Sequence, residues 1–247
     1  RDPAYRRDSI ARAAREIRNR FGAALPIGTR QDPDRPRDLL TGTFGAMMIP
    51  GLFGVPLHFP EDDWPWIEPG HALSDREADG LVPPDLDRNP FWDEFLGQLD
   101  WIERECGRIA GFINWQGALN SAYRLRGLAV YRDIAAHPDR ARHLFDCIVQ
   151  VMLDGARRLQ ARQRQSGFDY DHFTVSNCLV NTVSPAHYRD LLLPFDRRLA
   201  ESFGSIGVHN CAWNADPYVP FYATLPRVSY IDMGLDSDLA AARAAFP

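Results

Sequence analysis

A histidine and a cysteine separated by one residue form the most chemically informative pair in this chain of 247 residues. His209 and Cys211 follow residues 205–208, whose apolar character is typical of a short buried strand. Side chains two positions apart on a strand point to the same face, so we expect the imidazole and the thiol to lie side by side where the strand ends. Such a pair can bind a metal ion or activate a sulfur atom, and both groups suit zinc.

Polar side chains also follow three other predicted strands. These strands are expected at 108–113, 172–176 and 228–232. The polar residues at their ends are Asn114 with Gln116, Asn177 with Cys178, and Asp232. Because an α/β barrel builds its site from the ends of successive strands, we expect these side chains to gather around His209 and Cys211.

Each of these residues has a functional and a structural interpretation. We expect Asp232 to orient His209 or to act as an acid or base, and we group Asn177 with it as a catalytic residue. We expect Asn114, Gln116 and Cys178 to contact the substrate, with Cys178 also a candidate third metal ligand. Alternatively, Asp232 caps a helix or loop, the amides satisfy loop ends, His209 is a hydrogen-bonded polar group and Cys211 a small packing residue.

The order of the predicted elements defines the fold class. Helices are expected at 8–21, 91–105, 121–134, 138–167, 185–203, 217–224 and 237–245, and further strands at 45–49 and 205–208. Strands alternating with helices indicate a parallel sheet with helices outside it. We therefore predict an α/β fold, a TIM-type (β/α)8 barrel that is incomplete, with about five to six of the eight strands that closure needs.

Two regions are predicted along the chain. Residues 1–44 form an N-terminal helix followed by a loop at 26–37, and residues 45–247 form the barrel domain, which is apparently truncated at its C-terminus. The long segment 50–90 is rich in Pro, Gly, Trp and acidic residues and is expected to be a loop. Its Trp64, Trp66, His58 and His71 either contact a substrate or anchor an irregular surface excursion.

The composition excludes several function classes. The net charge is −5 and the basic residues are interspersed with acidic ones, so we expect no nucleic-acid partner. All 28 basic residues are Arg, which excludes Schiff-base, pyridoxal-phosphate and P-loop chemistry that requires Lys. We find no apolar run long enough for a membrane span, and the widely spaced cysteines favour reduced thiols in a cytoplasmic protein.

An ordered series of short motifs resembles one known family. The motifs are Gly111-Phe112-Ile113-Asn114, Arg124-Leu125-Arg126-Gly127, His137-Pro138-Asp139, Val183-Ser184-Pro185-Ala186-His187-Tyr188, Leu193-Pro194-Phe195 and Val208-His209-Asn210-Cys211. From about Gly45 to Pro247 the chain resembles the uroporphyrinogen decarboxylase family, which includes zinc-dependent methyltransferases that move methyl groups between cobalamin proteins and thiols. The resemblance implies a (β/α)8 barrel with its site at the C-terminal mouth. It also implies that His209 and Cys211 match the His-x-Cys zinc ligands of the methyltransferases, whose later Cys would lie beyond Pro247.

Three functions follow from the resemblance and the site residues. The first is a metal-assisted methyltransferase that uses zinc, a corrinoid methyl donor and a thiol-like acceptor. The second is a cofactor-independent uroporphyrinogen decarboxylase, although Asn177 stands where many family members have Asp. The third is a non-catalytic barrel that binds a corrinoid or a partner. We expect a small-molecule substrate in either enzyme, with a corrinoid protein and a second copy of the chain, in a homodimer, as candidate partners.

Overall fold

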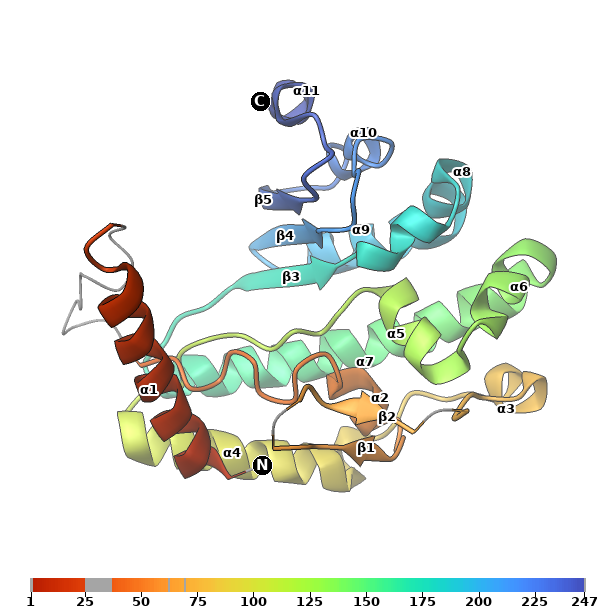
Figure 1. Cartoon of the computed structure of the whole chain (residues 1–247). Helices are drawn as coiled ribbons and strands as arrows, with labels where there is room; N and C mark the ends of the chain where they lie inside the picture. The colour runs from red at the N-terminus through yellow and green to blue at the C-terminus, as the bar shows by residue number, and fades with distance from the viewer. Residues whose placement is uncertain (1, 25–36, 62, 69, 247) are drawn as a thin grey trace.

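The computed structural model describes residues 2–24, 37–61, 63–68 and 70–246 (Figure 1). The helices are α1 (Pro3–Phe21), α2 (Met48–Leu52), α3 (Asp75–Asp79), α4 (Pro90–Cys106), α5 (Ala118–Arg126), α6 (Ala129–Ala136), α7 (Pro138–Gln165), α8 (Pro185–His187), α9 (Leu193–Ser202), α10 (Val219–Tyr222) and α11 (Leu239–Ala245), with shorter helical segments η1 (Leu86–Arg88), η2 (Cys178–Thr182) and η3 (Tyr188–Leu192). The strands are β1 (Leu57–His58), β2 (Trp66–Ile67), β3 (His172–Ser176), β4 (Ser205–Asn210) and β5 (Val228–Met233).

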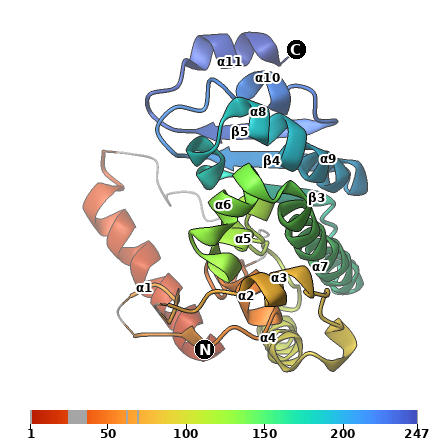
Figure 2. The same ribbon diagram turned by 90° about the vertical axis from the view of Figure 1, so that its right-hand side faces the viewer.

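A parallel sheet in the order β3-β4-β5 forms the centre of the C-terminal half. In Figure 1 this sheet lies above the long helix α7, and in Figure 2 the helices α8 to α11 surround it. The register pairs Ser176 with His209 and His209 with Asp232, so the carboxyl ends of the three strands meet at one edge. This confirms the predicted α/β class and the predicted strands at 172–176, 205–208 and 228–232.

The two faces of this sheet differ in chemistry because side chains alternate along each strand. One face carries Phe173, Val175, Ile206 and Val208, which are at most 2% exposed. The other face is polar, with one hydrogen bond between His172 Nδ1 and Ser205 Oγ and one between the Thr174 and Tyr230 hydroxyls, each 2.8 Å long. Tyr230 lies across Gly207, where an added Cβ would be 2.1 Å from the ring, so a larger residue would displace the tyrosine.

The predicted strand at 45–49 is wrong. Residues 41–46 form turns, with positive φ at Gly42, Phe44 and Gly45, and helix α2 begins at Met48. Every residue of α2 is buried, so the apolar run has no polar face to reveal a helical period. A short apolar segment of this kind has the same sequence pattern in a buried strand and in a buried helix.

The predicted strand at 108–113 is also wrong, although it is partly extended. It makes a single isolated bridge between Ala110 and Asp38, and Gly111 has φ 112°. Side chains bond most of its backbone groups: Gln163 Nε2 donates to the carbonyls of Ile109 and Gly111, the Ile109 N–H donates to Ser166 Oγ, and the Phe112 N–H donates to Thr41 Oγ1. Within the described residues no closed barrel forms, and the parallel sheet has three strands.

Two predicted helices are interrupted for identifiable backbone reasons. The helix expected at 121–134 divides into α5 and α6 at Gly127, whose φ of 62° ends α5. The helix expected at 185–203 contains the π-helical segment η3 immediately before Pro194. Proline lacks an N–H and clashes with the carbonyl four residues earlier in a regular α-helix, and the wider π turn accommodates it.

The long segment 50–90 contains a two-stranded antiparallel ribbon, β1–β2, that pairs Leu57 with Ile67 and His58 with Trp66. Helix α3 follows it and is held against α5, α6 and α7 by ion pairs. Arg126 is 3% exposed and donates to Asp133, which is fully buried, over 2.8 Å, while Arg140 binds Asp79 over 2.6 Å. Asp75 on α3 also contacts Arg126 and Arg140. These charges connect α3 to the helical core.

Helix α1 lies on the surface, whereas the described residues that follow it from 37 to 44 reach the core. Helix α1 buries none of its residues, and Arg6 donates to the Leu39 carbonyl over 2.9 Å. Leu39, Leu40 and Phe44 belong to the main hydrophobic core, whereas the loop predicted at 26–37 lies, except for residue 37, outside the described residues. The boundary between 44 and 45 stays a prediction. None of the described helices has both the length and the apolar character that crossing a bilayer requires.

Candidate metal centre

Two thiols and one imidazole come together at the carboxyl edge of the sheet. The ligand atoms of Cys178, His209 and Cys211 lie within 4.8 Å of one another, and the two sulfur atoms are 3.4 Å apart. Cys178 and His209 are half-buried and Cys211 is exposed. The structure therefore places the predicted His209 and Cys211 pair together, with Cys178, the candidate third ligand, beside them.

The strand register positions this cluster. The Asn177 N–H donates to the His209 carbonyl over 2.7 Å, which continues the β3–β4 ladder one residue beyond Ser176. Cys178, the first residue of η2, consequently leaves the sheet beside Cys211, which follows β4. Residues 33 positions apart in the sequence thus become neighbours through parallel pairing alone.

Asp232 contacts His209 from the neighbouring strand. Its Oδ2 lies 2.5 Å from His209 Nδ1, and the two residues are direct partners in the β4–β5 register. A carboxylate on one ring nitrogen holds that nitrogen protonated and leaves Nε2 with its lone pair. The arrangement suits a histidine that binds a metal through Nε2, with Asp232 as the residue that orients the ring.

The donor set and its spacing fit zinc. Ligand distances of about 2.0–2.3 Å in a tetrahedral site place the ligand atoms roughly 3.5–4 Å from one another, close to the spacings in this cluster. Burial and the neighbouring Cys178 raise the pKa of the Cys211 thiol, while His209 lowers it. A bound cation reverses this balance because it stabilises thiolates directly. The exposure of Cys211 leaves one side of the cluster open to a further ligand.

Asn114 and Gln116 lie in a hydrogen-bonded chain that leads to the same edge. Ser176 Oγ and Gln116 Nε2 both donate to Asn114 Oδ1, over 3.1 and 2.9 Å. Asn120 on α5 continues the chain, donating to Gln116 Oε1 and accepting from the Leu179 N–H of η2. The sequence analysis missed Asn120, since nothing local distinguishes it from a solvent-facing helix residue. The role of Asn114 and Gln116 in substrate binding stays a prediction.

Asn177 is buried beneath the cluster and is 2% exposed. Its Nδ2 donates to Asp196 Oδ2 over 2.6 Å, and Tyr188 donates to the same oxygen over 2.6 Å. An added Cβ at Gly117 would lie 2.2 Å from Asn177 Oδ1, so only glycine allows α5 to begin this close to the strand end. Asp196 and Tyr188 lie within the predicted helix at 185–203, and no sequence pattern marks them as partners of Asn177. A catalytic role for Asn177 stays a prediction.

The buried Asp196 carboxyl predicts a pH-dependent stability. Burial raises its pKa to about 6, although the bonds from Tyr188 and Asn177 oppose the shift. Because the folded state then holds its proton more tightly than the unfolded state, the contribution of Asp196 to stability falls as pH rises from about 4 to about 6 and changes no further above that range. In the wild type this carboxyl should lower the free energy of unfolding by about 3 kcal/mol over that range, and Asp196→Asn should not show this decrease. Urea unfolding of both proteins between pH 4 and 7 measures the difference. A stability difference between the two proteins that does not change with pH would contradict this assignment.

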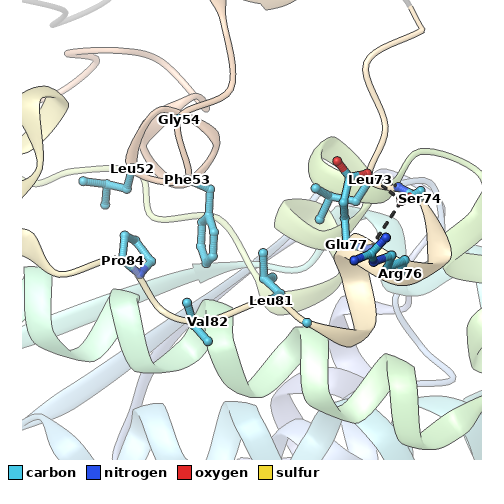
Figure 3. Close-up of a pocket in the computed structure, with 11 residues that line it drawn as sticks. Leu52, Phe53, Gly54, Leu73, Ser74, Arg76, Glu77, Leu81, Val82 and Pro84 are labelled. Atoms are coloured by element: carbon cyan, nitrogen blue, oxygen red, sulfur yellow. Dashed lines mark hydrogen bonds between the residues drawn. The ribbon is translucent and has the colours of Figure 1, made fainter.

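A large hollow in the described surface lies away from the metal cluster. It has a volume of about 900 Å³ and is lined by α2, α3 and the segment after α3. Figure 3 shows its apolar wall of Leu52, Phe53, Leu81 and Val82. The polar groups on its other side, Ser74 and Glu77, are bonded to each other in a capping box and offer little free hydrogen-bonding capacity.

Comparison with known proteins shows what this fold resembles. No family model and no curated protein sequence matches the chain. Among solved structures it is similar to a methyltransferase from Methanosarcina mazei, with a TM-score of 0.56 and 15% sequence identity. The match covers 74% of this chain and 53% of the other, so the matched part spans about half the length of that methyltransferase. The chain thus shares its fold with part of a methyltransferase.

Proposed function

We propose that the chain is a member of the uroporphyrinogen decarboxylase family, of the methyltransferase type, and that Cys178, His209 and Cys211 hold a zinc ion. The observation that carries the proposal is the convergence of these three donors within 4.8 Å at the carboxyl edge of a parallel sheet. The fold shared with a methyltransferase supports the reaction class. Cys178 would serve as the third ligand beside His209 and Cys211.

Zinc in such a site supplies a Lewis acid that lowers the pKa of an acceptor thiol and so favours a nucleophilic thiolate near neutral pH. The chain's own groups would do the remaining work. Asp232 would keep His209 in one tautomer and one orientation. The half-exposed polar face of the sheet, with Thr174 and Tyr230, would line the approach to the cluster. A corrinoid would serve as the methyl donor.

The test is a metal-dependent methyl transfer. The protein, purified under reducing conditions, is assayed for zinc by mass spectrometry and for methyl transfer from methylcobalamin to 2-mercaptoethanesulfonate. We expect one zinc ion per chain, loss of transfer on removal of zinc by a chelator, and recovery on its return.

Two results would overturn the proposal. Turnover of uroporphyrinogen by the metal-free protein would instead establish the decarboxylase. Corrinoid binding without transfer to any thiol, in a protein that contains no zinc, would favour the non-catalytic barrel.

A further inference from the structure

A second hollow lies between the β1–β2 ribbon and the C-terminal part of α5. Its volume is about 580 Å³, within the range of small-molecule sites. Three aromatic side chains, Trp64, Trp66 and Tyr123, line it together with Arg124. Trp64 is 74% exposed and Tyr123 is 38% exposed, so their rings are available to a ligand.

Arg124 is half-buried, and its guanidinium has no partner among the described residues. Its Nε atom is shielded from solvent and makes no hydrogen bond, and the side chain forms no ion pair with any described residue. Burial lowers its pKa, and no described carboxylate counteracts the shift. Arg126, two residues further along, is buried between Asp75 and Asp133 and shows how this fold satisfies a structural arginine. A partly desolvated cation without a counter-charge is a ready partner for an anionic ligand.

The only carboxylate among the described lining residues is already engaged. Glu68 Oε2 lies 2.7 Å from His58 Nε2, and the His58 ring stacks on Trp66 at 4.0 Å between centroids. These two contacts of His58 hold the Glu68 carboxylate and the Trp66 ring in place on the ribbon, so Trp66 forms a fixed wall of the hollow. The hollow therefore presents a free positive charge beside flat apolar surfaces.

We propose that this hollow binds a small aromatic carboxylate, with the acid group on Arg124 and the ring against Trp64, Trp66 and Tyr123. A planar guanidinium matches a carboxylate through two parallel hydrogen bonds, and aromatic side chains stack on planar ligands. The larger hollow in Figure 3 lacks this combination because its arginine, Arg76, is exposed and Phe53 is the one aromatic residue among its described lining residues. No residue of the metal cluster lines the site, so this proposal does not rest on zinc.

The test measures binding of four carboxylates (benzoate, 4-hydroxybenzoate, 1-naphthoate and indole-3-acetate) and of their carboxamides, in the presence of a chelator. Calorimetry and quenching of tryptophan fluorescence report binding. We expect at least one acid to bind and its amide to bind at least about tenfold more weakly. Arg124→Gln should lower the affinity for that acid by a similar factor. Arg76→Gln, an exposed arginine that lines the other hollow, is the matched control and should leave binding unchanged.

Thermal unfolding without ligand separates binding from structure. Because Arg124 is half-buried and has no described partner to lose, we expect Arg124→Gln to melt at the same temperature as the wild type or higher, and only the wild type to be stabilised by the acid. The proposal fails if none of the four acids binds, if Arg124→Gln binds them as well as the wild type, or if Arg124→Gln melts below the Arg76→Gln control.

Discussion

Replacing both Cys178 and Cys211 by serine is expected to lower zinc affinity on the order of 10³-fold or more. Loss of a residue that only orients a ligand already costs about 10- to 100-fold, and this variant removes two ligand atoms themselves. A serine hydroxyl is a poor substitute because it remains protonated near neutral pH, whereas a thiol loses its proton to the metal. Competition with a chromogenic chelator measures the change.

The matched control for this variant is Cys106→Ser, which changes a half-buried thiol outside the cluster. Both proteins must be kept reduced, since two sulfur atoms 3.4 Å apart are susceptible to oxidation to a disulfide that would block the site. Circular dichroism confirms that each variant folds, as the exposure of Cys211 leads us to expect. If the zinc affinity of the double variant stays within about threefold of the wild type, Cys178 and Cys211 are not the zinc ligands.

Arg126→Met is expected to lower the free energy of unfolding by about 3–5 kcal/mol. The substitution keeps most of the side-chain volume but leaves Asp133, which is fully buried, without its 2.8 Å partner. Arg140 Nη1, at 3.3 Å from Asp133, can compensate only in part because its Nε already binds Asp79. A buried carboxylate with too few partners is one of the few causes of so large an effect. Urea unfolding monitored by tryptophan fluorescence provides the measurement.

A second substitution distinguishes the uncompensated charge from simple loss of packing. In the double variant Arg126→Met/Asp133→Leu both charges are absent, and stability should return most of the way to the wild type. Arg88→Met serves as the surface control, because its side chain is 88% exposed and its contact with Asp85 is 3.9 Å long. A loss below about 1 kcal/mol for Arg126→Met would show that water reaches Asp133 or that Arg140 replaces the lost partner.

The stability of the α3 region and the proposed ligand site are connected through α5. Arg126 at the end of this helix holds α3, and Arg124 one half-turn earlier faces the second hollow. The start of the same helix is fixed by Gly117 against Asn177 and by Asn120 against η2. Helix α5 therefore links the metal cluster at one end with the second hollow at the other. Replacing Arg126 should lower stability because Asp133 loses its partner, whereas replacing Arg124 should weaken ligand binding without lowering stability.

The sequence alone determined the elements whose signals are local. The strands at 172–176, 205–208 and 228–232 follow from short apolar runs between helices, and their parallel order follows from the alternation itself. The side-by-side placement of His209 and Cys211 needs only the two-residue period of a strand. Asp232 reaches His209, and Cys178 reaches Cys211, because parallel register brings strand ends to one edge.

Only the tertiary structure decided the features that depend on distant partners. The segment 108–113 is not a strand because Gln163 and Ser166 of the α7 region, about 50 residues away, bond its backbone. Nothing in the local sequence distinguishes Asp196 or Arg124. Asp196 bonds Asn177, and Arg124 lacks a described partner, only as a result of folding. Local periodicity records which face of an element is apolar, whereas desolvation and missing partners are properties of the assembled chain.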